Sequence, residues 1–201
     1  FGKSYLSAWL LLINAIQSDS KDVFYVGPTF QQAKDIMWGM LKDLGKDLIV
    51  AAHENTAVLT LINGRKIYLK GSDRPDTLRG VGLAYCVLDE YANMKPQVWE
   101  QIIRPTLSDV QGGALFIGTP AGKNHFFDLY NDAQDDDEWE AFQFTSIDNP
   151  FIPEKEIKAA SKSMSSMSFR QEFEASFESF SGGIFKEDWF IVDEEPEEGH
   201  Y

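Results

Sequence analysis

The sequence AYCVLDE, residues 84–90, is an apolar run that ends in two adjacent carboxylates, Asp89 and Glu90. Such a run predicts a buried strand, and ligands of open α/β sheets bind beyond the carboxyl ends of the strands. At that edge Asp89 would hold Mg²⁺, directly or through water. Glu90 would act as a general base or orient the water that attacks a γ-phosphate. The alternative is a strand that ends in a solvated acidic turn.

The first four residues, Phe1-Gly2-Lys3-Ser4, stand directly before an apolar helical pattern. Gly-Lys-Ser in this position matches the last part of the phosphate-binding motif G-x-x-x-x-G-K-[ST]. Backbone N–H groups at the helix start, including the Gly2 segment, would bind phosphate oxygens, Lys3 would reach the β- and γ-phosphates, and the Ser4 hydroxyl would bind Mg²⁺. The alternative is an ordinary helix start capped by Ser4. Lys3 precedes Asp89 by about 85 residues, and the two signals together predict a magnesium–nucleotide site.

A third signal is Gly118-Thr119-Pro120, which follows the apolar run Leu115-Phe116-Ile117. A strand beside the one that bears Asp89 would place the Thr119 hydroxyl near the γ-phosphate, where it would sense whether that phosphate is present. The alternative is a common Gly-Thr-Pro turn, which the tripeptide by itself favours.

Three arginines are candidates for stabilising the charge of a transferring phosphoryl group, in cis or from a neighbouring subunit. They are Arg74, Arg79 and Arg104, and Arg79, within Leu78-Arg79-Gly80, is the first choice. The alternative for each is a surface salt bridge, which we prefer for Arg104. His125 is interpreted as a helix-start residue.

Composition bounds the class of protein. The chain has 201 residues, 43% of them hydrophobic and 25% charged, and its formal net charge is −14. This length fits one α/β domain with a small appended subdomain. Nucleic-acid binders are usually basic, so the acidic net charge restricts any DNA contact to a subset of residues.

The single cysteine, Cys86, excludes an internal disulfide or a cysteine-based zinc cluster and is expected in the core. No apolar stretch approaches the roughly 18 residues of a membrane span.

The predicted elements alternate along the chain. Helices are predicted over residues 4–18, 29–44, 96–107, 124–132, 153–164 and 168–177, and strands over 23–26, 57–61, 66–69, 85–88, 114–117 and 141–144. Asn63-Gly64 between two β-rich runs predicts a hairpin. Leu6, Trp9, Leu10 and Ile13 fall at helical spacing, and Leu11 and Leu12 are apolar as well, which predicts a largely buried first helix. The alternation predicts a mostly parallel sheet with helices on both faces.

Five segments, in order and spacing, resemble the large terminase subunits of tailed bacteriophages. They are residues 71–80 (GSDRPDTLRG), 87–92 (VLDEYA), 104–109 (RPTLSD), 116–124 (FIGTPAGKN) and the run from Asp148-Asn149-Pro150 to residues 169–173 (FRQEF). The resemblance implies a P-loop NTPase core of the additional-strand, conserved-glutamate type. It implies an ATP- and Mg²⁺-binding loop at Gly2, Lys3 and Ser4, a metal aspartate at Asp89 and a catalytic glutamate at Glu90. It further implies a coupling motif at Gly118, Thr119 and Pro120, and an arginine at Arg79 that acts on the adjacent subunit.

The resemblance also implies a division of the chain into an ATPase core over residues 1–148, a helical lid subdomain over 149–180 and an acidic linker over 181–201. The adenine-contacting segment and the first loop glycine would lie upstream of Phe1, and a metal-dependent nuclease domain would follow Tyr201.

At the level of the assembly, the resemblance implies a homo-oligomeric ring that translocates double-stranded DNA into a procapsid. The partners would be the portal protein and the small terminase subunit, with no membrane. The place would be the host cytoplasm, at the portal vertex of the procapsid. The alternatives are a helicase-like nucleic-acid translocase and a non-catalytic assembly module.

Overall fold

A six-stranded sheet of order β2-β3-β4-β1-β5-β6 forms the centre of the computed structural model, which describes residues 2–178. The strands are β1 Asp22–Gly27, β2 Ile49–His53, β3 Val58–Leu61, β4 Lys66–Gly71, β5 Leu83–Asp89 and β6 Gly113–Ile117. The neighbours β4, β1, β5 and β6 run parallel, whereas β2 and β3 are antiparallel to their neighbours. The carboxyl ends of the four parallel strands therefore meet at one edge of the sheet.

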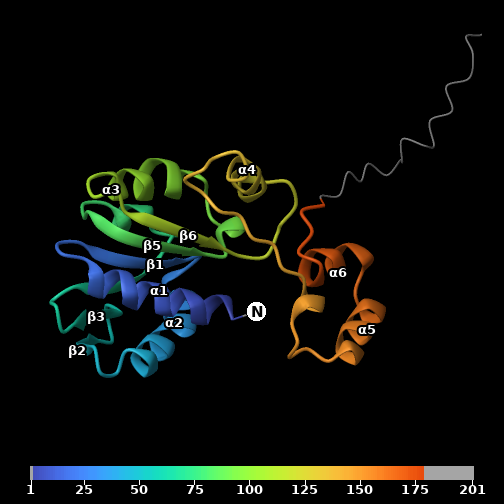
Figure 1. Ribbon diagram of the computed structural model, residues 1–201, viewed down its shortest axis with the longest axis horizontal. Coiled ribbons are helices and arrows are strands. Elements are labelled where there is room, and N and C mark those ends of the chain that lie inside the picture. The colour runs from blue at the N-terminus through green and yellow to red at the C-terminus, as the bar shows by residue number, and fades with distance from the viewer. Residues whose placement is uncertain (1, 179–201) are drawn as a thin grey trace, which may run out of the picture.

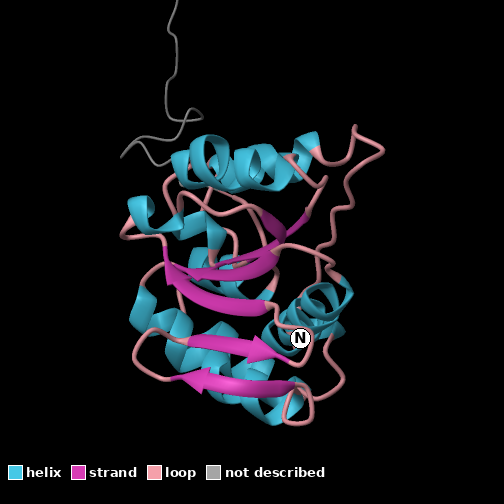
Figure 2. Cartoon of the chain, turned by 90° about the vertical axis from the view of Figure 1, so that its left-hand side faces the viewer, coloured by secondary structure: helices cyan, strands magenta, loops and turns pink. Residues whose placement is uncertain are grey.

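Helices cover both faces of this sheet, as predicted (Figures 1 and 2). Helices α1 Lys3–Gln17 and α2 Phe30–Leu44 pack on one face, where Tyr25 and Val87 join their core. The π-helical turn η3 Val98–Ile103, helix α3 Arg104–Ser108 and helix α4 His125–Asp132 cover the other. Cys86 is buried in that second core, in agreement with its predicted place.

The hairpin prediction is confirmed, and one strand beside it was missed. β3 and β4 pair antiparallel around a turn in which Gly64 has φ +80°, a conformation that favours glycine. β2 lies at the sheet edge, and three of its five residues are exposed. An edge strand needs little apolar alternation to pair with one neighbour. The sequence of β2 therefore lacks the alternating pattern from which a strand is predicted.

The prediction that the first helix is largely buried holds for only one side of α1. Leu6, Trp9 and Ile13 are 55%, 40% and 44% exposed, and Leu10 is only half-buried. The buried stripe consists of Ser7, Ala8, Leu11, Leu12 and Ala15. Both stripes have helical spacing, and the one with small side chains lets the helix approach the sheet closely. Periodicity indicates a helix in either case, but it does not decide which of two apolar stripes faces the core.

Two further predictions needed correction. Residues 141–144 lie in a loop rather than in a strand of the sheet, and Phe142 and Phe144 are exposed. The predicted helix over 96–107 is a π-helical turn followed by α3. Pro105 lacks the N–H that would donate to the carbonyl of Gln101 in a regular helix, which explains the interruption.

Helices α5 Glu154–Ser163 and α6 Ser166–Phe173, with the 3-10 turn η4 Ser146–Asp148, form a small group beside the sheet. Figure 1 shows that this group faces the carboxyl edge of the sheet, with the N-terminal end of α1 between them.

The last helix ends at Phe173, earlier than the predicted residue 177. The predicted linker over 181–201 lies outside the described residues. None of the helices within residues 2–178 combines the length and apolarity needed to cross a bilayer.

Candidate functional site

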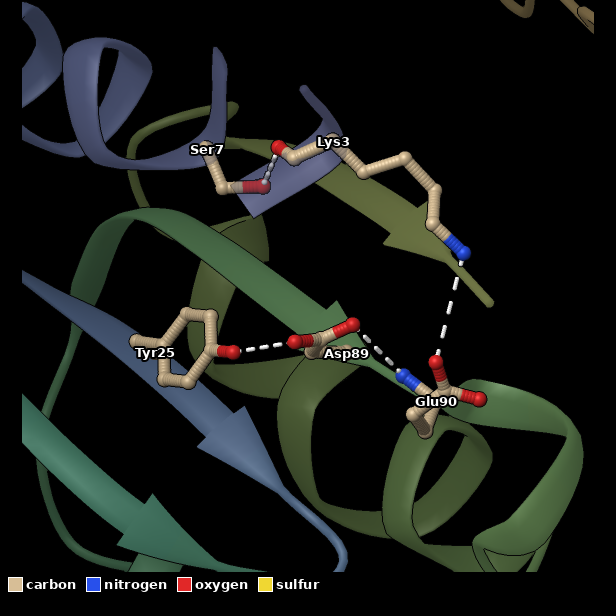
Figure 3. Close-up of polar contacts among 5 residues, drawn as sticks. All are labelled: Lys3, Ser7, Tyr25, Asp89 and Glu90. Carbon is tan, nitrogen blue, oxygen red and sulfur yellow. Dashed lines mark hydrogen bonds and ion pairs between the residues drawn. The ribbon is translucent and has the colours of Figure 1, made fainter. Parts of the chain in front are cut away.

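The N-terminal end of α1 opens onto the carboxyl edge of the sheet. Helix α1 begins at Lys3, and Gly2 before it has φ +72°, a left-handed conformation that a residue without Cβ adopts readily. The Ser7 hydroxyl donates to the Lys3 carbonyl at 2.8 Å, and Ser4 lies half-buried in the same turn. Lys3 Nζ lies 4.0 Å from Glu90 Oε1, so the two residues meet across about 85 positions of sequence (Figure 3).

Asp89 is the last residue of β5 and is 5% exposed. Its Oδ2 accepts a hydrogen bond from the Tyr25 hydroxyl, and its Oδ1 accepts one from the Glu90 N–H at 2.9 Å (Figure 3). Burial, with the Asp89 carboxylate beside it, raises the pKa of Tyr25, so the hydroxyl stays protonated and donates. The carboxylate is therefore fixed at both oxygens, with its remaining lone pairs available to a ligand.

Glu90 follows in a left-handed turn, with φ +54° and ψ +45°. Such a conformation is uncommon for a residue with a side chain, and strain of this kind often accompanies functional sites. Burial raises the pKa of Glu90, and the charges of Asp89 and Glu172 add to this, while Lys3 and a hydrogen bond from the Thr119 backbone lower it. The net shift is upward, which brings the carboxylate towards the range useful for proton transfer.

The segment Gly118-Thr119-Pro120 leaves β6 directly beside Glu90. A Cβ at Gly118 would lie 3.3 Å from the Glu90 Cα and the Tyr91 N, so only glycine allows this approach without adjustment. A cavity of about 160 Å³ lies next to this segment, and Lys3, Gly118, Thr119, Pro120 and Glu172 of α6 are among its lining residues, whereas Asp89 and Glu90 are not. The structure thus brings Lys3, Asp89, Glu90 and Thr119 to one place. It is the backbone of Thr119, however, that contacts Glu90.

Arg79 lies elsewhere. Its side chain is 54% exposed, its Nε is 3.9 Å from Asp76 Oδ1, and its Nη1 donates to the Gln101 carbonyl at 3.5 Å. It does not line the cavity beside Lys3. Arg104 is exposed and, within residues 2–178, makes no ion pair, so the salt bridge preferred for it was wrong.

Two polar residues at the start of α4 were not recognised as part of this region. The Asn124 Nδ2 donates to the Ala92 carbonyl at 3.2 Å, and the His125 Nε2 lies 3.0 Å from the Tyr91 carbonyl oxygen and donates to it. Both carbonyls belong to η2 Tyr91–Asn93, the turn directly after Glu90. The helix start at Asn124 was readable from the sequence, and its Oδ1 does accept from the Phe126 N–H. Its bonds across the fold had no sequence signal.

Comparisons with known proteins identify the family of the chain. The family described as "Terminase large subunit, T4likevirus-type, N-terminal" matches residues 1–191. The large terminase subunit of Escherichia phage T5 is 30% identical over 191 residues, which are 92% of this chain and 43% of that protein. The chain therefore spans less than half the length of this relative.

Solved structures share the fold. The large terminase ATPase domain of Thermus phage P74-26 has a TM-score of 0.76 at 24% identity, over 88% of this chain and 84% of that one. The large terminase of another thermophilic bacteriophage, in complex with ADP, has a TM-score of 0.73 at 22% identity, over 88% of this chain and 46% of that one. These matches confirm the predicted fold class, an α/β sheet with helices on both faces. By the match over residues 1–191 and the identity to the phage T5 protein, the chain belongs to the terminase large subunit family, in its N-terminal part.

Proposed function

We propose that this chain is the ATP-hydrolysing part of a terminase large subunit, and that it binds Mg²⁺-ATP between the start of α1 and the ends of β5 and β6. The observation that carries the proposal is the convergence of Lys3 Nζ and Glu90 Oε1, 4.0 Å apart, at the carboxyl edge of the sheet. An ammonium next to two carboxylates suits a magnesium-bound triphosphate, which brings both kinds of charge to the site. The ADP complex of the thermophilic phage terminase supports it further.

Each residue has a chemical task in this proposal. The N-terminus of α1, with Gly2 in its left-handed conformation, offers backbone N–H groups to phosphate oxygens. Lys3 neutralises the β- and γ-phosphates, and the Ser4 hydroxyl and Asp89 are the protein oxygens for the metal. Magnesium takes oxygen ligands and keeps several waters, so one fixed carboxylate and a hydroxyl fit its needs. Bound there, the ion would neutralise charge on the phosphates.

Glu90 is the proposed general base. In the structure it faces Lys3, and a bound triphosphate would compete with Glu90 for that ammonium. Lys3 would then pair with the phosphates and leave the carboxylate to orient and deprotonate the attacking water. Thr119 would sense whether the γ-phosphate is present, through its hydroxyl and through its backbone hydrogen bond to Glu90. Arg79 would act on the site of the adjacent subunit.

The proposed domains follow the same division as the sequence prediction. Residues 1–148 form the ATPase core, 149–180 a lid whose Glu172 lines the cavity, and 181–201 a linker. In the whole protein we propose a homo-oligomeric ring that moves double-stranded DNA into a procapsid, with the portal protein and the small subunit as partners. Its place is the host cytoplasm at the portal vertex, and the full-length protein also carries a metal-dependent nuclease. Family membership supports a role in DNA packaging rather than in a helicase.

Replacing Lys3 by Ala tests the proposed function. A hydrogen bond to a charged group contributes about 1.5–3 kcal/mol, so we expect the Kd for Mg²⁺-ATP of the full-length protein to rise about tenfold to a hundredfold. Lys46→Ala, at an exposed lysine after α2, is the matched control. Titration with a fluorescent ATP analogue measures both. Equal affinity in wild type and Lys3→Ala contradicts the proposal.

The raised pKa of Glu90 predicts a pH dependence. A general base works ionised, so kcat/KM falls as pH drops through the pKa of the free enzyme's Glu90, above the ordinary glutamate range. The charge of Glu172 favours the protonated form of Glu90, and Glu172→Gln removes it. The acid limb of kcat/KM should therefore move to lower pH in Glu172→Gln and stay in place in Glu174→Gln, the control just after α6. A limb that moves to higher pH, or equally in both variants, contradicts this assignment.

A further inference from the structure

Tyr25 is a fully buried tyrosine whose hydroxyl contacts Asp89 of the proposed site from within the core. It lies at the centre of β1, paired in register with Val87 of β5, and is 0% exposed. Its ring belongs to the core under α1 and α2, and its hydroxyl donates to Asp89 Oδ2, two residues further along β5 (Figure 3). A phenylalanine would fill the same apolar space. The hydroxyl is therefore the part of this side chain that packing does not explain.

The contact fixes a carboxylate that would otherwise rotate. Asp89 Oδ1 is held by the Glu90 N–H at 2.9 Å, and Oδ2 by the Tyr25 hydroxyl. With only the first bond, the carboxylate could turn about its Cβ–Cγ bond. With both hydrogen bonds in place, the plane of the carboxylate is fixed. The lone pairs that accept no hydrogen bond then point in fixed directions. Groups that hydrogen-bond a metal ligand orient it in this way, and their loss typically reduces metal affinity.

We propose that Tyr25 is a positioning residue for the metal-binding carboxylate of Asp89, and that it sets the affinity of the nucleotide site for the divalent cation. The inference rests on the proposed function, because it takes Asp89 as the metal ligand. A purely structural alternative exists: a buried tyrosine hydroxyl needs a partner, and Asp89 would then serve only as that partner. The two explanations differ in what the removal of the hydroxyl does to cation binding.

Tyr25→Phe removes the hydroxyl and keeps the ring. We expect the Mg²⁺ concentration for half-maximal ATP turnover by the full-length protein to rise about tenfold to a hundredfold, and saturating Mg²⁺ to restore turnover. Binding of Mn²⁺ in the presence of ADP, followed by electron paramagnetic resonance, should weaken by the same factor. The affinity for a fluorescent ATP analogue in EDTA should not change, because no cation is involved in that measurement.

Two comparisons separate positioning from a general structural effect. Tyr85→Phe, at a half-buried tyrosine on the neighbouring strand β5, should leave the cation dependence unchanged. Tyr25→Phe in an Asp89→Asn background should add no further loss of Mn²⁺ affinity, because the group through which Tyr25 acts has already been altered. Thermal unfolding of each variant shows whether its fold is kept, and the double variant gives a readout relative to its own parent.

The outcomes distinguish this inference from the proposed function. A wild-type protein that shows no cation-dependent nucleotide binding overturns both. Normal cation dependence in wild type, with an unchanged Mn²⁺ affinity in Tyr25→Phe, overturns the role of Tyr25 alone. An equal loss of nucleotide affinity in EDTA and in Mg²⁺ likewise overturns it, since it would show that the hydroxyl only supports the fold.

Discussion

Glu90→Gln should reduce ATP turnover by the full-length protein about 10²–10⁴-fold, the usual contribution of a general base, while nucleotide affinity is kept. The amide has nearly the same shape as the carboxylate but cannot take up the proton of the attacking water. It also removes the charge that faces Lys3 at 4.0 Å in the structure. The ammonium is then free for phosphate, so affinity for ATP should be equal to that of the wild type or tighter.

Single-turnover hydrolysis separates this effect from product release, and a fluorescent analogue measures affinity. Glu100→Gln is the matched control, because this glutamate is exposed on η3, whereas it is Glu90 that faces Lys3. It should hydrolyse ATP at the wild-type rate. Turnover near the wild-type rate in Glu90→Gln would remove Glu90 from its proposed role. Loss of binding together with turnover would show a disturbed site, because the left-handed turn at Glu90 also donates the N–H that holds Asp89.

Local patterns in the sequence were sufficient for most of the fold. The apolar run before Asp89, the helix predicted over residues 29–44 and the Asn63-Gly64 hairpin all formed as predicted. Each depends on interactions within a few residues or on burial of a whole strand. The predictions that were wrong concern features that depend on contacts between distant parts of the chain. The buried side of α1, the edge strand β2 and the loop at residues 141–144 depend on which neighbour is present, and a single sequence does not contain that information.

The same distinction applies to the site. Lys3 and Glu90 were placed together because each carries a motif, and motif residues of an α/β sheet share one edge. The Tyr25 hydroxyl and the His125 contact to η2 belong to no motif, and Asn124 and Glu172 lie in segments of the resemblance that assigned them no role. A tyrosine in an apolar strand or an acid on a helix is common, and its partner is set by the packing of distant elements. Residues that support a site are therefore harder to predict than those that define it.

Arg79 is the residue whose proposed role depends most on the assembly. In this chain it lies on the loop after β4, bonded to Asp76 and to the Gln101 carbonyl, and it is not among the residues that line the cavity beside Lys3. More than half of its side chain is exposed. An arginine that acts on a phosphoryl group within its own subunit would be expected beside Lys3 and Glu90, and the partners of Arg79 are instead Asp76 and Gln101. Its position on the surface favours action on the site of a neighbour.

Mixing variants tests this proposal. Arg79→Ala alone should lower ATP turnover about 10³–10⁵-fold, as for other arginines that stabilise the phosphoryl transition state. Mixed with Glu90→Gln, it should regain activity, because a subunit with Glu90 can receive Arg79 from its neighbour. Glu90→Gln mixed with Lys3→Ala should remain inactive, because both residues belong to one site and no neighbour replaces them. ATPase rates across mixing ratios, under conditions of ring assembly, measure this. If the first mixture is as inactive as the second, Arg79 acts within its own subunit or not at all, and the loop after β4 would have to move towards the cavity to contribute.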